Sequence, residues 1–283
     1  MRLPGPSRRS RALTGTVGLL CAAALAGLVG CSGESDPPSD LPSDGAGKAS
    51  PAPEGDLAGT VVEAVAVTRR TSARFDQEIT MSDGKQTQLL FIKGDFDMAG
   101  DMGRLTVEMP EIGGARAEEL FVAGKVYLRA VKETAGPWGY FDRNKSEVHL
   151  PLRAPMNDPE HTLFQVGMAK NVYYQGVEKM NGAPAKHYRG MLDHLAVSLR
   201  LGESQQEDAN RERASRGEDV PVYADVWIDE AGRVVQTRTA FGFGGNTTTV
   251  TTVFSDFGKP VKVTAPPAAG LATLSPVPHI LTG

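Results

Sequence analysis

Apolar and polar residues alternate one by one along much of this chain, and that period limits the possible folds more than any other feature. Phe75 and Ile79 alternate with charged residues in one such segment, and Leu105 and Val107 belong to another. Successive side chains of a strand point to opposite faces, so a period of two predicts strands with one buried and one solvated face. The chain is therefore expected to consist mainly of half-buried strands.

Short turn motifs separate these segments and predict hairpins. Asn181-Gly182 is the strongest, because both residues tolerate the positive φ that a two-residue hairpin turn requires. Ser82-Asp83-Gly84-Lys85, Ala123-Gly124 and Glu230-Ala231-Gly232 mark further turns. The turns divide the chain into roughly ten strands, too many for one flat sheet. An antiparallel sheet of that width is expected to curl toward an incomplete β-barrel.

Three segments change to a helical period. Leu57–Arg70 carries apolar residues at helical spacing. Asp158-Pro159-Glu160 predicts the start of a helix that runs to Asn171, with an acidic N-cap and a proline at the first helical position. A third helix begins at Asp193 and leads into the charged segment Glu203–Gly217. The predicted fold class is α+β: a strongly curved antiparallel sheet whose concave face the helices cover around an apolar cavity.

The N-terminus has the pattern of a secretory signal. Four arginines come first, and an uncharged stretch of mainly small and apolar residues then runs from Ala12 to Val29. That stretch is short for a membrane span. Leu28-Val29-Gly30-Cys31 resembles the bacterial lipobox, whose cysteine receives a diacylglycerol and becomes residue one. Two acyl chains hold a protein durably on a bilayer. We therefore expect lipid anchoring at Cys31, on the extracytoplasmic face of the cell membrane.

These signals divide the chain into four parts. Residues 1–30 are the expected signal peptide, and residues 31–56 form a lipidated tether, rich in Ser, Gly and Pro, with little to bury. Residues 57–268 are the expected lipid-binding domain, and residues 269–283 are a C-terminal tail. Ser7-Arg8-Arg9-Ser10 starts like a twin-arginine signal but continues differently, so that route and general secretion both stay open.

Charge and cysteine content exclude several classes of function. Removing the four arginines of residues 1–30, which contain no acid, takes the formal net charge from −4 to −8. An acidic domain lacks the concentrated basic surface that nucleic-acid binding requires. Cys21 leaves with the signal and Cys31 is acylated, so the mature domain has no thiol for a disulfide, a zinc site or a nucleophile.

Catalytic motifs are also missing from the sequence. The histidines do not have metal-ligand spacing, and no Gly-x-Ser-x-Gly elbow occurs. Asp193-His194 is the nearest approach to an acid–base pair, and it is interpreted as a helix N-cap with an exposed neighbour. No enzyme activity, cofactor or metal is expected.

Two segments in the C-terminal third resemble those of the LppX/LprG/LprA/LprF lipoproteins. One runs from Val220 to Val235 and contains Ala224-Asp225-Val226-Trp227-Ile228. The other runs from Phe254 to Val263 and is followed by Ala265-Pro266-Pro267. The order of signal, lipobox, tether, first helix and strands is also similar. The resemblance implies the fold of the lipoprotein carrier LolA, an incomplete barrel closed by helices around a cavity that takes acyl chains.

The resemblance further implies a lipid or glycolipid ligand that the protein carries at the cell envelope, with a membrane transporter as a further partner. The cavity lining is predicted to be inward-facing apolar residues, each of which also fits an ordinary packed core. The predicted set is Phe75, Ile79, Leu105, Val107, Leu120, Val126, Leu128, Leu163, Phe164, Met168, Leu195, Leu199, Val222, Val226 and Ile228.

Two other functions stay open on the sequence alone. LolA-shaped domains also resemble the sensor module of the envelope regulator RseB, which carries a further C-terminal domain; the stretch after Pro260 is expected to hold none. The other alternative is a structural envelope lipoprotein without a ligand. The identity of the lipid has no signal in the sequence.

Overall fold

The computed structural model describes residues 55–110, 114–131, 137–143, 158–197, 207, 210, 211, 213–215, 222–243 and 246–273. The predicted signal peptide, Cys31, most of the tether, Leu199 and most of the segment 203–217 lie outside the described residues.

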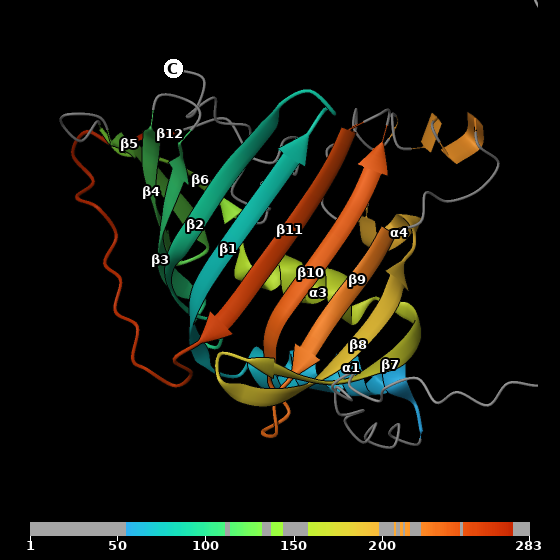
Figure 1. Ribbon diagram of the computed structural model, residues 1–283. Coiled ribbons are helices and arrows are strands. Elements are labelled where there is room, and N and C mark those ends of the chain that lie inside the picture. The colour runs from blue at the N-terminus through green and yellow to red at the C-terminus, as the bar shows by residue number, and fades with distance from the viewer. Residues whose placement is uncertain are drawn as a thin grey trace, which may run out of the picture. The chain divides into compact units, whose positions relative to one another are not determined.

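In the described residues, twelve strands form one open, strongly curved sheet (Figure 1). Their order is β12-β6-β5-β4-β3-β2-β1-β11-β10-β9-β8-β7, so β12 and β7 are the edges. Neighbours pair in antiparallel fashion, except that β12 is parallel to β6. The strands are β1 (Ser72–Ser82), β2 (Thr87–Asp97), β3 (Met102–Met109), β4 (Ala115–Val122), β5 (Lys125–Val131), β6 (Gly139–Asp142), β7 (Lys170–Met180), β8 (Ala183–Leu192), β9 (Val222–Ile228), β10 (Val234–Phe243), β11 (Asn246–Ser255) and β12 (Ala272–Thr273).

The strand count corrects the expectation of roughly ten strands. The additional strands are β6, of four residues, and β12, of two residues. A period of two cannot be recognised over so short a segment, and both strands exist because a neighbour pairs with them. The predicted open and curved sheet, built mainly of antiparallel strands, is confirmed.

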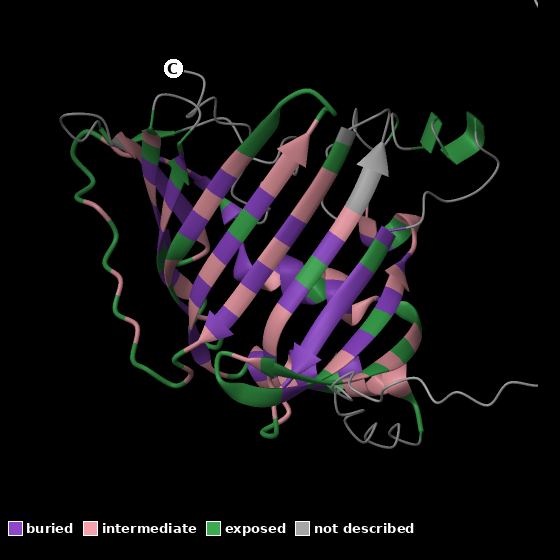
Figure 2. Ribbon diagram, in the orientation of Figure 1, coloured by how far each residue is buried: buried purple, intermediate pink, exposed green. Residues whose placement is uncertain are grey.

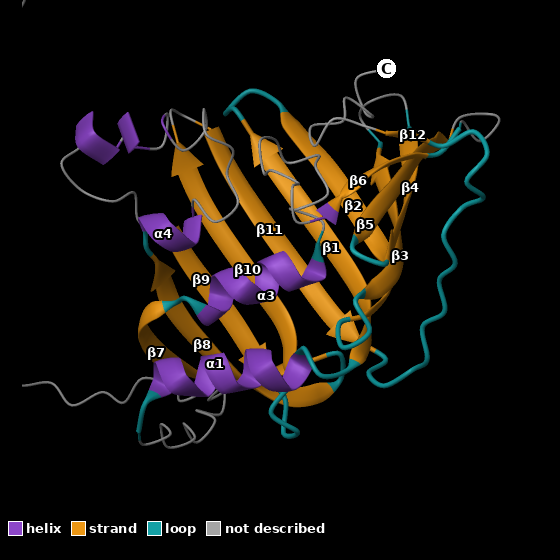
Figure 3. Ribbon diagram, turned by 180° about the vertical axis from the view of Figure 1, so that it is seen from behind, coloured by secondary structure: helices purple, strands orange, loops and turns teal. Residues whose placement is uncertain are grey.

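Three described helices lie over one face of the sheet (Figure 3). They are α1 (Leu57–Thr68), α3 (Pro159–Gly167) and α4 (His194–Val197). An aspartate caps each of the first two: Asp56 Oδ1 accepts from the Gly59 amide at 2.9 Å, and Asp158 Oδ1 accepts from the Glu160 amide at 3.0 Å. Helix α3 ends before the predicted Asn171, because the chain enters β7 at Lys170.

The helix-covered face of the sheet holds the hydrophobic core. Ile79 of β1 lies directly opposite Leu90 of β2 and Val250 of β11, and all three are buried. Burial alternates along the central strands, as Figure 2 shows for β1 and β11. Leu163 of α3 belongs to the same cluster of buried apolar residues, so helices and strands share one core.

Glycines permit two local features of this sheet. Asn181 and Gly182 have φ values of 49° and 88°, which matches the predicted two-residue turn between β7 and β8. A Cβ atom at Gly94 would lie 1.9 Å from the carbonyl oxygen of Arg104 on β3, so only glycine allows this close approach of β2 and β3.

Candidate functional site

Most of the predicted lining residues come together on the helix-covered face. They belong to one cluster of buried apolar side chains, which contains Phe75, Ile79, Leu105, Val107, Val126, Leu128, Leu163, Val222, Val226 and Ile228. Met168 packs against that cluster. A packed core and a ligand-filled interior both require this arrangement, so their role as a cavity lining stays a prediction.

Three of the other predicted residues lie elsewhere. Leu120 is buried, but it lies opposite Arg104 and Tyr127 on the face away from the cluster. Phe164 and Leu195 are exposed by 40% and 66%. The Arg69 guanidinium lies over the exposed Phe164 ring, 4.1 Å from its centroid.

The cluster also contains residues that were not predicted to line it. The main additions are Leu90, Ile92, Phe96, Phe121, Tyr188 and Phe254. The period of two along β2 would have indicated the first three, because they occupy alternate positions of that strand. Tyr188 carries no such signal, since a tyrosine is as common on a surface as in a core.

Several polar side chains interrupt the apolar face, among them Gln77, Thr252 and Glu119. Gln77 of β1 is 2% exposed, and its Nε2 donates to Thr252 Oγ1 on β11 at 2.9 Å. The same amide lies 3.5 Å from Thr162 Oγ1, which brings α3 to the sheet. Glu119 of β4 is 3% exposed and lies opposite Leu105 and Leu128. The interior is thus predominantly apolar, with polar groups at a few defined positions.

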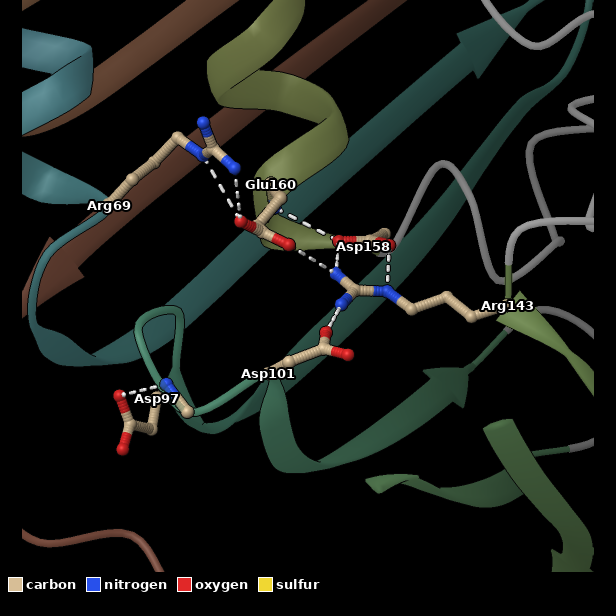
Figure 4. A network of polar contacts seen from close by, with 7 residues as sticks. Arg69, Asp97, Asp101, Arg143, Asp158 and Glu160 are labelled. Atoms are coloured by element: carbon tan, nitrogen blue, oxygen red, sulfur yellow. Dashed lines mark hydrogen bonds and ion pairs between the residues drawn. The ribbon is translucent and has the colours of Figure 1, made fainter. Parts of the chain in front are cut away.

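A buried ionic network fixes the N-terminal end of α3 (Figure 4). The Arg143 side chain is 7% exposed, and its Nε donates to Asp158 Oδ2 at 2.6 Å. Its Nη2 contacts Asp158 Oδ1 and Glu160 Oε2, the latter at 3.0 Å. Its Nη1 contacts Asp101, in the turn between β2 and β3. One guanidinium therefore joins the end of β6, the start of α3 and the β2–β3 turn.

Glu160 extends the network to α1. Its Oε1 accepts hydrogen bonds from Nη2 and Nε of Arg69, at 2.9 and 3.1 Å. Arg69 is the C-cap of α1, so four segments that are distant in the sequence converge at this point. The sequence predicted Asp158 only as an N-cap, because nothing in a linear pattern indicates which cation will reach it.

The charges in this network compensate one another. Burial alone would lower the pKa of Arg143, but the hydrogen bond and the charge of Asp158, followed by those of Glu160, outweigh it and raise the pKa. The guanidinium also lies 5.1 Å from the ring centroid of Phe96 and 5.4 Å from that of Phe121. The ion pairs of Arg143 therefore hold the start of α3 against the end of β6 and the β2–β3 turn.

Two observations concern other kinds of site. Within the described ranges, no group of three or more His, Cys, Asp and Glu side chains is arranged to hold a metal ion. None of the helices described is both long and apolar enough to cross a membrane.

No protein-family model matches this chain, and neither does any curated protein. Solved structures are similar in fold. LprF from Mycobacterium bovis is 12% identical, with 76% of this chain and 99% of that chain covered and a TM-score of 0.46. The lipoprotein LppX from Mycobacterium tuberculosis is 13% identical, with 74% and 98% covered and a TM-score of 0.47. A LolA superfamily protein from Nitrosomonas europaea is 8% identical, with 74% and 96% covered and a TM-score of 0.30.

LprF and LppX are members of the lipoprotein group that the sequence resembles. A LolA superfamily protein is also among the solved structures of similar fold. The predicted resemblance is confirmed in this sense. Identities and TM-scores this low indicate a similar fold and do not identify a ligand.

Proposed function

We propose that this protein is a lipid-anchored envelope lipoprotein that binds the acyl chains of a lipid or lipidated molecule between its sheet and its helices, and carries them at the cell envelope. The observation that supports the proposal is the predominantly apolar face, which extends over most of the sheet and onto α1 and α3. Aliphatic and aromatic side chains dominate it, and such surfaces suit acyl chains because they require no directional partner.

The ionic network suggests how the helix layer opens. It holds the N-terminal end of α3 through Arg143 and Arg69. Toward the other end, Gln165 Nε2 of α3 donates a hydrogen bond of 3.3 Å to the carbonyl oxygen of Ala196 in α4. A neutral hydrogen bond is weaker than a buried, charge-assisted network. We therefore place the movement that admits a ligand on the α4 side of α3.

Native mass spectrometry combined with lipid extraction tests the proposal. The full chain, made in its own host and released in mild detergent, is expected to carry an acyl-bearing molecule in addition to its own anchor. A Cys31→Ala form of the chain gives the same measurement without the anchor. Binding to neither form would refute the proposed function and leave the structural lipoprotein.

A transfer assay separates a carrier from a sensor. The loaded chain is mixed with acceptor vesicles of phosphatidylglycerol and phosphatidylethanolamine, and the bound lipid is followed over time. A carrier releases its lipid to the vesicles, whereas retention of the lipid would favour the sensor.

A further inference from the structure

A hollow lies beside the N-terminal part of α1, at the border of the buried apolar cluster. Its volume is about 480 Å³, and Thr60 of α1, residues of β7, β8 and β9, and the β9–β10 turn line it. Figure 3 shows α1 crossing this end of the sheet beside β7 and β8. A hollow of this size is in the range of small-ligand sites.

The register shows which side chains face the hollow. Val177, Lys186 and Ile228 lie directly opposite one another on β7, β8 and β9, so they share one face of the sheet. All three line the hollow. Tyr188 follows Lys186 by two residues and has the same orientation.

Polarity changes sharply along the inner face of β8. Lys186 is exposed, whereas Tyr188 is 1% exposed and belongs to the buried apolar cluster. Ile228 also belongs to both the hollow and the cluster. The hollow therefore borders the apolar interior at Tyr188 and Ile228, while Lys186 lies on its solvent-exposed side.

Lys186 is the one cation among the described residues that line the hollow. Asp229 is neutralised by Arg233, whose Nη2 and Nε lie 2.7 and 2.9 Å from Asp229 Oδ2. Among the residues that the structure describes, no ion pair joins Lys186 to a carboxylate. Glu230 is exposed and is the remaining acid of the lining.

We propose that this hollow takes the anionic head of an amphiphile, with the head on the Lys186 ammonium and the acyl chain directed past Tyr188 into the apolar interior. The proposal rests on the proposed function, since it assigns one end of the same ligand. A carboxylate and a phosphate share the required chemistry, because an ammonium binds either as a point charge.

Two fluorescent probes test the assignment on the full chain: cis-parinaric acid, which is anionic, and its uncharged methyl ester. Lys186→Glu is expected to weaken binding of the acid about tenfold and to change that of the ester less than about twofold, because only the acid loses a charge partner. Glu230→Gln is expected to strengthen binding of the acid. Lys179→Glu is the matched control, since Lys179 lies on the same hairpin but does not line the hollow.

The possible results separate the two proposals. If neither probe binds the unaltered chain, the proposed function itself fails. In the second case, both probes bind, and Lys186→Glu either changes their affinities no more than Lys179→Glu does or weakens both affinities equally. Either result would refute the head-group site and leave acyl binding in place. Competition by palmitate and by lysophosphatidic acid then distinguishes a carboxylate from a phosphate head. Equal competition by uncharged monopalmitoylglycerol would overturn the preference for an anion.

Discussion

His187 lies flat against Trp227 on the outer face of the sheet, with ring centroids 4.3 Å apart and planes inclined by 13°. Its Nδ1 is 2.7 Å from Glu178 Oε1 on β7, and its Nε2 is 2.8 Å from Asp225 Oδ1 on β9. Both ring nitrogens can donate only when the imidazole is protonated. The charged form of this histidine therefore connects the edge hairpin to the rest of the sheet.

Stability is expected to fall as the pH rises through the titration of His187. Burial alone would lower the pKa of His187, but hydrogen bonds with Asp225 and Glu178 outweigh it and raise the pKa. A raised pKa means that the contribution is complete below the unfolded value of about 6.5 and is lost as the pH passes the higher folded value. The urea midpoint of the full chain should decrease accordingly as the pH rises above about 6.5.

His187→Gln removes the titrating group and should flatten this decrease, whereas His194→Gln, a change in α4, should retain it. The nearby acids do not titrate in the same range. The hydrogen bond from Trp227 is the main reason that the pKa of Glu178 is lowered. Burial would raise the pKa of Asp225, but bonds from His187 and Arg189 lower it. An equal decrease in all three proteins would contradict the prediction.

Arg143→Met is expected to destabilise the fold strongly. It leaves Asp158 and Glu160 without their shared cation, and side chains of Arg143 and Asp158 are exposed by only 7% and 2%. Breaking one partner of a buried pair costs about 3 kcal/mol or more. Chemical denaturation should show this loss in the free energy of unfolding.

Arg116→Met provides the control for that measurement. Arg116 pairs with Glu108 at 3.8 Å, and both side chains are about half exposed. Such a pair contributes less than about 1 kcal/mol. Similar losses in the two variants would show that the buried network does not fix α3.

Val222→Trp distinguishes an open interior from a packed core. Val222 is 3% exposed and lies in the apolar cluster. In a packed core the larger side chain should cost about 1–3 kcal/mol through overpacking. In an interior that holds acyl chains, the melting temperature should change little while the co-purified lipid disappears.

Thr249→Trp serves as the control for Val222→Trp, because Thr249 lies opposite Thr80 and Ala240 on the outer face of the sheet. It should leave lipid occupancy unchanged. Strong destabilisation by Val222→Trp in a protein that never carried lipid would show that these residues are ordinary core.

Cys31→Ala is expected to release the protein from the membrane fraction or to leave an unprocessed precursor. The reason is that the proposed anchor consists of two acyl chains on this cysteine, and the apolar stretch before it is short for a span. Labelling with a fatty-acid analogue and fractionation measure the effect. Normal labelling of the variant would contradict the lipobox interpretation.

The elements that the sequence predicted correctly are those whose conformation depends on residues close together in the chain. The alternation around Phe75 and Ile79, the Asn181-Gly182 turn and the N-cap at Asp158 each depend on neighbouring residues only. Helical spacing predicts Phe164 as a lining residue, but the ring is exposed and lies under the guanidinium of Arg69. The sequence of α3 carries no information about that contact with α1. Leu120 has a buried position, but its face follows from the pairing of β4 with β3 and β5.

The sequence by itself therefore determined a curved sheet of mainly antiparallel strands, capped helices and the apolar composition of one face, since these follow from local conformation and periodicity. Tertiary structure alone decided three things: the pairing that creates β6 and β12, the meeting of Arg69, Arg143, Asp158 and Glu160, and the burial of Tyr188 next to an exposed Lys186. Each depends on distances between residues that are far apart in the chain, and local patterns carry no information about those distances.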